Sequence, residues 1–325
     1  MSKQFIKDLK IGSFVQSQFF VVEVNEQTFS TPNRAGESFL KIILGDISGT
    51  IRGIIWDRSL LPEPVYPDDV LNISGEVKDY YGLQLNINCC EKIAKDKINR
   101  AYFQQSCERD YEEMWAELQN ITAAAVKDPH LSALVDQFYG DKDLVERFKL
   151  SPAARVIHHS YLGGLLEHTL EVIGFCSHAV SLYPQQLNES LLITAAIFHD
   201  IGKVEEYNLD SLSFQQTDRG RLLGHISIGI EIVRRMMAHT PGIPEGIKLE
   251  LEHMLLSHHG EKEWGSPEIP QTFAAFTLFH ADLLSARLRQ FAQVMERGDV
   301  NTAWTKHDRF LQRRVFTGFS QNISD

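Results

Sequence analysis

Histidine and aspartate side chains that can bind metal recur in this 325-residue sequence beyond residue 150. The stretch HDIGK places His199 and Asp200 side by side at the end of the apolar run LLITAAIF, with Lys203 three residues after Asp200. Most of the thirteen histidines lie between His158 and His280. An imidazole and a carboxylate are costly to bury without partners. A strongly apolar run is therefore not expected to end on such a pair unless the pair has a function.

These residues belong to an ordered series in which each member lies on, or at the end of, an apolar helix-like segment. The series is His168, His199, Asp200, His225, His258, His259 and Asp282. Imidazole nitrogens with carboxylate oxygens are a ligand set suited to Mn, Fe, Co, Ni and Zn, and no thiolate is present to demand zinc. We therefore expect a metal centre in which Asp200 bridges two divalent ions. Two ions about 3.5–4 Å apart would activate a water molecule and bind the oxygens of a phosphodiester.

Some of these residues also have an ordinary structural interpretation. A single histidine in an apolar helix is more often a hydrogen-bonded core residue, which is what we expect of His178, His239, His253 and His280. We predict catalytic roles for Asp200 and Lys203, since the Lys203 ammonium would stabilise charge on a phosphate oxygen. The alternative for Lys203 is a solvated lysine that complements the helix dipole. Gly202 is expected to end the helix and to leave Lys203 near the open side of the site.

Two regions of different hydrophobic periodicity must position this series. From Gly12 to about Ile93, short β-rich runs alternate with turn residues, and GDISGT is expected to be a tight hairpin connection. Roughly five strands in about 80 residues suit a small Greek-key barrel such as an OB-fold, with a β-sandwich as the alternative. Beyond Lys95 the apolar residues follow the helical period. We predict a nucleic-acid-binding OB-fold domain, a helical connector and an all-α domain, over residues 1–93, 94–150 and 151–325 respectively.

The composition is that of a globular protein, with 43% hydrophobic and 23% charged residues. The net charge of −11 argues against binding duplex nucleic acid mainly by phosphate neutralisation, although it does not exclude a local basic groove. No apolar run reaches the length of a membrane span, and the first residues lack the apolar core of a secretory signal. The four cysteines form no CxxC pair. We expect a reduced, cytoplasmic protein that does not bind membranes.

The ordered series and the form HDIGK resemble the HD-domain superfamily of metal-dependent phosphohydrolases. The resemblance implies two metal sites that share one aspartate. The ligands of the first would be His168, His199, Asp200 and Asp282. The ligands of the second would be Asp200, His225, His258 and His259. The GYP element of the cyclic-dinucleotide hydrolases does not follow His259, so a cyclic dinucleotide is not the expected substrate. No carboxylate stands four residues before His168, so a third metal is not expected.

A narrower resemblance uses both halves of the chain. A β-barrel followed by a helical connector, the stretch SPAARVIHHSYLGGLLEHTLEV and HDIGK is similar to the YhaM-type 3′-5′ exoribonucleases over nearly the whole chain. This resemblance implies a manganese-dependent enzyme that trims single-stranded RNA from its 3′ end, with single-stranded DNA as a further candidate substrate. The expected partners are single-stranded RNA or short oligonucleotides. It is also consistent with a homo-oligomer.

The sequence gives weaker indications of which residues contact the substrate. In the helical region, His159 is expected near the substrate, and Arg155 and Arg289 are candidates for phosphate contacts, with solvated surface positions as the alternative for the arginines. On the barrel, sequence-tolerant binding of single strands requires aromatic rings beside cations. We predict this role for Trp56 and Tyr81, which lie at strand ends beside polar residues. Most aromatic side chains of a small barrel belong to its core, which is their alternative.

Three functions follow from these features. The first is a 3′-5′ exoribonuclease. The second is a phosphohydrolase of a small nucleotide or cyclic dinucleotide, in which the barrel regulates or assembles the enzyme. The third is a nucleic-acid-binding adaptor with a purely structural metal site, although such a site seldom needs so many polar ligands with a lysine beside them. Mn²⁺ is the expected ion, and Fe, Co, Ni and Zn are alternatives because availability as well as affinity decides which metal binds.

Overall fold

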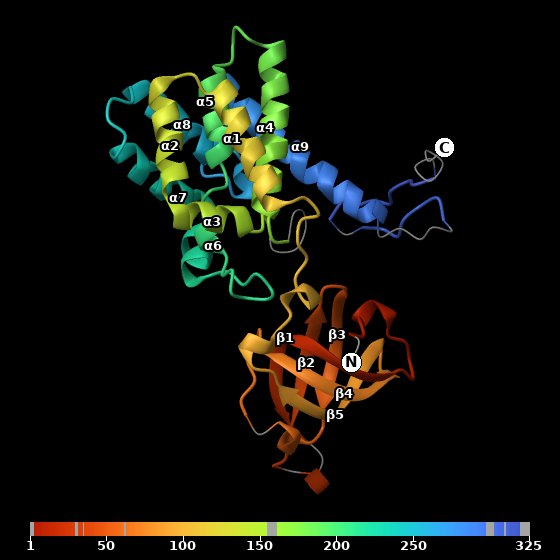
Figure 1. Ribbon diagram of the computed structural model, residues 1–325. Coiled ribbons are helices and arrows are strands. Elements are labelled where there is room, and N and C mark those ends of the chain that lie inside the picture. The colour runs from red at the N-terminus through yellow and green to blue at the C-terminus, as the bar shows by residue number, and fades with distance from the viewer. Residues whose placement is uncertain are drawn as a thin grey trace. The chain divides into compact units, whose positions relative to one another are not determined.

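The computed structural model describes residues 3–29, 32–34, 36–61, 63–154, 161–296, 302–308 and 310–318. The chain divides into two compact units (Figure 1). Each unit has a hydrophobic core of its own. The first unit comprises Met1–Gln105 and Asp210–Gln215, and the second comprises Ser106–Leu209 and Gln216–Asp325.

The first unit is a closed five-stranded barrel, drawn in red to orange in Figure 1. Its strands are β1 (Phe14–Thr28), β2 (Ser38–Asp46), β3 (Gly49–Ile55), β4 (Val70–Asp79) and β5 (Leu83–Lys92). Their order is β1-β2-β3-β5-β4, in which β1 pairs with both β2 and β4, and β3 runs parallel to β5. Because this is a small closed Greek-key barrel, the OB-fold prediction is confirmed and the sandwich alternative is wrong.

The alternating sequence of the strands produces the barrel core. Leu71, Ile73 and Val77 on β4 lie two or four residues apart and are all buried, because residues two apart in a strand point to the same side. The GDISGT stretch forms the expected hairpin connection, since β2 ends at Asp46 and β3 begins at Gly49.

Residues Asp210–Gln215 belong to the first unit although they lie far along the sequence from its strands. Leu212 is buried in an apolar cluster that includes Phe103. Ser213 donates its backbone N–H and its hydroxyl to Asp68 Oδ1, over 3.2 and 2.9 Å. The apolar and polar contacts of this loop therefore complete the barrel unit.

The second unit contains the α-helices of the described chain, and the all-α prediction is confirmed. They are α1 (Tyr111–Ala125), α2 (Pro129–Gly140), α3 (Lys142–Leu150), α4 (Gly164–Leu182), α5 (Glu189–Phe198), α6 (Lys203–Glu206), α7 (Asp218–Ala238), α8 (Glu245–Ser257) and α9 (Phe273–Glu296). Several of these helices begin where a side chain accepts a hydrogen bond from a backbone N–H of the first turn. These N-caps include Asp110, Asp128, Asp141, Asn188 and Thr217.

Helix α5 occupies the middle of this unit. All of its residues after Glu189 are buried, and it contacts α1, α2, α4, α8 and α9. A helix surrounded in this way must be apolar on every side, which explains the run LLITAAIF. Within the part of the chain that is described, none of the helices combines the length and the hydropathy that a membrane span requires. Helices α1 to α3, which fall in the predicted connector, belong to the second unit, and the functional domain boundaries stay a prediction.

Candidate metal centre

The turn between α5 and α6 presents Asp200. Helix α5 ends at Phe198, so the expectation that Gly202 ends this helix is wrong. Gly202 has a packing role instead, because a Cβ on it would lie 1.9 Å from the carbonyl oxygen of His225 and 2.6 Å from the backbone N of Gly229. The bare glycine therefore lets the turn lie directly on α7, which brings His225 beside Asp200.

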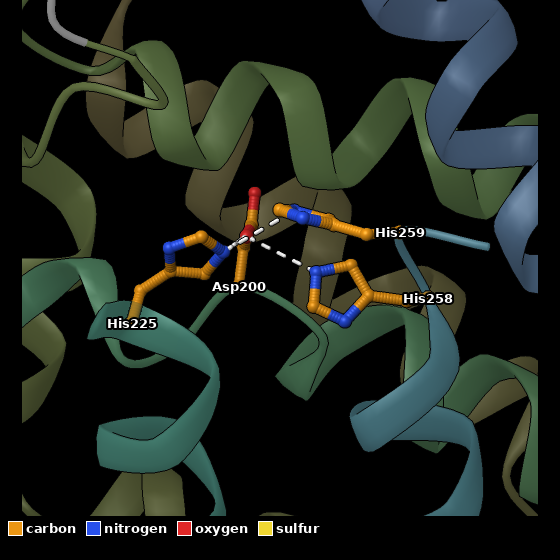
Figure 2. Close-up of side chains that lie close together, drawn as sticks. All are labelled: Asp200, His225, His258 and His259. Atoms are coloured by element: carbon orange, nitrogen blue, oxygen red, sulfur yellow. Dashed lines mark hydrogen bonds and ion pairs between the residues drawn. The ribbon is translucent and has the colours of Figure 1, made fainter. Parts of the chain in front are cut away.

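One group of candidate ligands, here named the His225 cluster, consists of Asp200, His225, His258 and His259. Figure 2 shows their side chains converging, with His225 on α7 and the other two rings directly after α8. Asp200 Oδ1 lies 3.5 Å from His225 Nε2 and 3.7 Å from His258 Nε2. The Nε2 atoms of His225 and His259 are 3.3 Å apart. A break in α7 at Gly224, whose φ is 71°, directly precedes His225 and requires a glycine.

The other oxygen of Asp200 faces a second group, the His168 cluster. This cluster consists of His168, His199, Asp200 and Asp282. Asp200 Oδ2 lies 3.6 Å from His168 Nε2 and 3.4 Å from His199 Nε2, and Asp282 Oδ1 lies 3.0 Å from His168 Nε2. The structure thus brings all seven predicted ligands together. Each oxygen of Asp200 faces a different set of imidazoles, which is the arrangement a carboxylate shared by two ions requires.

Two of the histidine rings, His199 and His258, point Nε2 toward the centre because Nδ1 has a partner elsewhere. His199 Nδ1 lies 2.8 Å from the carbonyl oxygen of Ala196, and His258 Nδ1 lies 2.7 Å from that of Leu255. A carbonyl oxygen can only accept, so the ring proton must be on Nδ1 in each case. The lone pair of Nε2 is therefore available to a metal ion, which is the usual state of a histidine ligand.

His168 is oriented by two polar side chains that sequence reasoning missed. Its Nδ1 lies 2.9 Å from the hydroxyl of Ser285, which donates its own proton to Glu171 over 2.6 Å. Glu171 lies three residues beyond His168 on α4, and Ser285 lies three residues beyond Asp282 on α9. Residues three apart on a helix share a face, so this spacing was a signal that could have identified both.

The donor atoms fit a divalent cation. Asp200 Oδ1 and His258 Nε2 are buried and have no hydrogen-bond partner among the described residues. A buried carboxylate oxygen and a buried imidazole nitrogen without partners are both costly, and a cation that binds them removes this cost. Nitrogen and oxygen donors without a thiolate suit Mn, Fe, Co, Ni or Zn.

Burial and neighbouring charges set the protonation of the centre. Burial would raise the pKa of the Asp200 carboxyl, but Lys203 and His199 hold this pKa well below its usual range. Burial lowers the pKa of His258, and it lowers the pKa of His259 to about 3, so both rings are neutral as ligands must be. Burial would also lower the pKa of His199, but the Asp200 carboxylate raises it.

Lys203 lies inside the centre and not on an exposed helix end. It is only 7% exposed, and its Nζ lies 2.5 Å from Asp200 Oδ2. This burial rules out the solvated-lysine alternative and the expected position on the open side. The ammonium holds the Asp200 carboxylate in place, and a direct catalytic role for Lys203 stays a prediction.

Comparison with known proteins yields both a domain and a family. Residues 165–287 match the HD domain family. The 3′-5′ exoribonuclease YhaM of Geobacillus sp. is 32% identical over 265 residues, which cover 81% of this chain and 80% of that protein. The chain belongs to the YhaM family. The YhaM of Bacillus subtilis is likewise 32% identical, over 81% of this chain and 82% of the relative.

The resemblances to HD-domain and YhaM-type proteins are therefore confirmed, and so is the prediction of a hydrolase. The alternative of a non-catalytic nucleic-acid-binding adaptor is thereby excluded. A solved structure, the second OB-fold domain of replication protein A from Methanococcus maripaludis, is 26% identical with a TM-score of 0.25. That match covers 28% of this chain and 95% of the archaeal domain.

The candidate phosphate contacts of this YhaM-family chain lie outside both clusters or outside the described residues. Arg289 is on α9, with its guanidinium 5.5 Å from the centre of the Tyr161 ring. The structure thus places it against Tyr161 and in neither ligand cluster. Arg155 and His159 fall in 155–160, which is not among the described residues.

The two residues predicted to stack on bases, Trp56 and Tyr81, lie in the first unit. Trp56 is 44% exposed, and its ring is stacked with Phe29 and lies 5.3 Å from Phe39. The guanidinium of Arg34 lies 3.7 Å from the centre of the Phe29 ring. Phe29 and Arg34 were not predicted from the sequence. Tyr81, at the turn between β4 and β5, is 92% exposed and belongs to no such cluster.

Proposed function

We propose that the protein is a 3′-5′ exonuclease that hydrolyses phosphodiester bonds of single-stranded RNA, with two divalent cations bound around Asp200. The observation that carries this proposal is the position of the Asp200 carboxylate, whose two oxygens face separate groups of imidazole nitrogens. The relatives in Geobacillus and Bacillus subtilis are 3′-5′ exoribonucleases by name, which supports both the direction and the substrate.

We assign one ion to the His168 cluster and the other to the His225 cluster. When bound, the ions would lower the pKa of a water molecule and stabilise negative charge on the phosphate oxygens. Asp200 is the shared ligand, and Lys203 keeps it ionised and oriented. Mn²⁺ is the proposed ion, as the resemblance to the YhaM-type enzymes implies. Fe, Co, Ni and Zn, which nitrogen and oxygen donors also suit, are the alternatives to compare with it.

A labelled single-stranded RNA tests this function. With Mn²⁺ and a 5′-labelled RNA, we expect a ladder of products that shorten from the 3′ end, whereas a 3′-labelled RNA should lose its label in the first products. DNA of the same sequence shows whether the 2′-hydroxyl is required. Intact RNA, together with phosphate or linear dinucleotide released from small substrates, would instead identify the small-nucleotide phosphohydrolase.

Trp56→Ala is expected to weaken the binding of single-stranded RNA by roughly 5- to 150-fold, because stacking is worth about 1–3 kcal/mol per base. Fluorescence anisotropy with labelled RNA measures this affinity, and kcat at saturating RNA should change little. Phe14→Ala is the matched control, since Phe14 is 63% exposed on the same unit but lies outside the cluster of Trp56, Phe29 and Phe39. Equal RNA affinities of the Trp56 variant and the wild type would exclude this role; Tyr81→Ala tests the other predicted ring.

The remaining proposals concern the setting of this activity. We propose that residues 1–93 bind nucleic acid and that 151–325 carry the hydrolase, joined by 94–150. The four cysteines are free, which is consistent with a reducing cytoplasm, where RNA is available. A homo-oligomer stays a prediction from the family resemblance.

A further inference from the structure

Glu206, the last residue of α6, is a buried carboxylate for which the proposed function has no role. It is 6% exposed, and its Oε2 lies 3.3 Å from His225 Nδ1. Oε1 accepts a hydrogen bond from Gln216 Nε2 over 3.1 Å, whereas Oε2 has no hydrogen-bond partner among the residues that are described. Because a buried carboxylate is costly without compensation, its relation to the His225 ring needs an explanation.

The surrounding backbone holds Glu206 in place. Its N–H donates to the carbonyl oxygen of Gly202 over 3.1 Å, and its own carbonyl oxygen accepts from the N–H of Thr217 over 2.9 Å. The start of α7 lies so close that a Cβ on Gly220 would be 2.5 Å from the Glu206 carbonyl oxygen. Glu206 is therefore fixed between the Asp200 turn and α7, and its carboxylate stays beside His225.

His225 differs from the other oriented rings of the centre in what faces its Nδ1. His199 and His258 donate to backbone carbonyl oxygens, and His168 faces a serine hydroxyl. For His225 the facing group is the Glu206 carboxylate, while Nε2 faces Asp200 on the other side of the ring. A carboxylate that accepts the Nδ1 proton of a histidine fixes the tautomer and makes the other nitrogen a stronger ligand. Glu206 Oε2, 3.3 Å from His225 Nδ1 and without another partner among the described residues, is within reach of that proton.

The two clusters differ in how many carboxylates they contain, and this difference also points to Glu206. The His168 cluster has Asp282 in addition to the shared Asp200, whereas the His225 cluster has only Asp200. Lys203 offsets part of the Asp200 charge, and neutral imidazoles add none. A divalent cation in the His225 cluster thus has no carboxylate of its own in direct contact. The Glu206 carboxylate lies behind His225, within a buried region where charges are weakly screened.

We infer that Glu206 is a positioning residue that orients His225 and supplies the negative charge that retains a divalent cation in the His225 cluster. This role rests on the proposed function only in that a cation binds there. It predicts that the two clusters depend differently on Glu206, because the His168 cluster has its own second carboxylate and its own orienting side chains, Ser285 and Glu171.

The test is the amount of Mn²⁺ bound per chain, measured by elemental analysis over a series of free Mn²⁺ concentrations. The wild type is expected to bind two ions, and Glu206→Gln, which keeps the shape but loses the charge, should bind one of them roughly 10- to 100-fold more weakly. Glu206→Asp, which retains the charge, should recover part of the loss. In a His225→Ala background, Glu206→Gln should have little further effect, because the residue acts through that ring.

Glu205→Gln is the matched control, since Glu205 is the sequence neighbour and pairs with Arg219 at 3.0 Å, outside both clusters. Two ions bound to Glu206→Gln with wild-type affinity would overturn the inference. So would weaker binding of both ions together with a lower melting temperature of the metal-free protein, because that result indicates a general structural role. If the wild type binds two ions but does not shorten RNA, the proposed function fails, and the selective loss in Glu206→Gln still supports the role of Glu206.

Discussion

Asp200→Asn is expected to reduce RNA hydrolysis by roughly a thousandfold or more, because a single substitution removes a ligand from both proposed ions. Each carboxylate oxygen of Asp200 faces a different cluster, so no neighbouring residue can replace it. Single-turnover rates on 5′-labelled RNA measure the loss, and the bound Mn²⁺ per chain should fall with them. His239→Ala is the control, because His239, contrary to the core position expected from the sequence, is exposed and hydrogen-bonded to the backbone carbonyl of Arg235.

The same substitution is expected to destabilise the fold, since it leaves the Lys203 ammonium buried without its counter-charge. Breaking one partner of a buried ion pair costs about 3–5 kcal/mol, whereas removing both is often close to neutral. Asp200→Asn with Lys203→Met should therefore recover most of the free energy of unfolding but none of the activity. Full turnover in Asp200→Asn, or activity regained in the double variant, would show that the site is wrongly assigned.

Gly202→Ala is the second substitution with a large expected effect. The added Cβ would meet two backbone atoms of α7, the His225 oxygen at 1.9 Å and the Gly229 nitrogen at 2.6 Å. Neither can move unless the α5–α6 turn separates from α7. We expect a loss of about 1–3 kcal/mol in the free energy of unfolding, measured with urea, and weaker binding of the cation at His225.

Gly174→Ala provides the matched comparison, because Gly174 lies inside α4 and an added Cβ there would meet nothing within 4 Å. A glycine inside a helix costs roughly 0.5–1 kcal/mol relative to alanine, so this variant should be more stable than the wild type. If Gly202→Ala unfolds at the same urea concentration as the wild type and keeps its metal affinity, the close approach of α7 at Gly202 contributes neither to stability nor to cation binding.

The sequence predicted the change from barrel to helices, because burial imposes a two-residue period on strands and a helical period on helices. It also predicted the seven candidate ligands that converge, since each is a polar residue within, or directly after, an otherwise apolar helix-like segment. Glu206 escaped prediction because it meets His225 only after the chain turns back between α6 and α7. Gly202 was misinterpreted because a glycine after a helix suggests a helix end, whereas here a neighbouring backbone requires it.

The loop Asp210–Gln215 limits how this chain can be divided. A fragment that ends at Gln105 would lack Leu212, which is buried in the cluster with Phe103, and would leave Asp68 without Ser213. A fragment that begins at Ser106 would carry Leu212 without the apolar residues that cover it. Separate expression of barrel and helices should therefore give poorly soluble pieces, and a chimera that exchanges the barrel between relatives must exchange this six-residue loop as well.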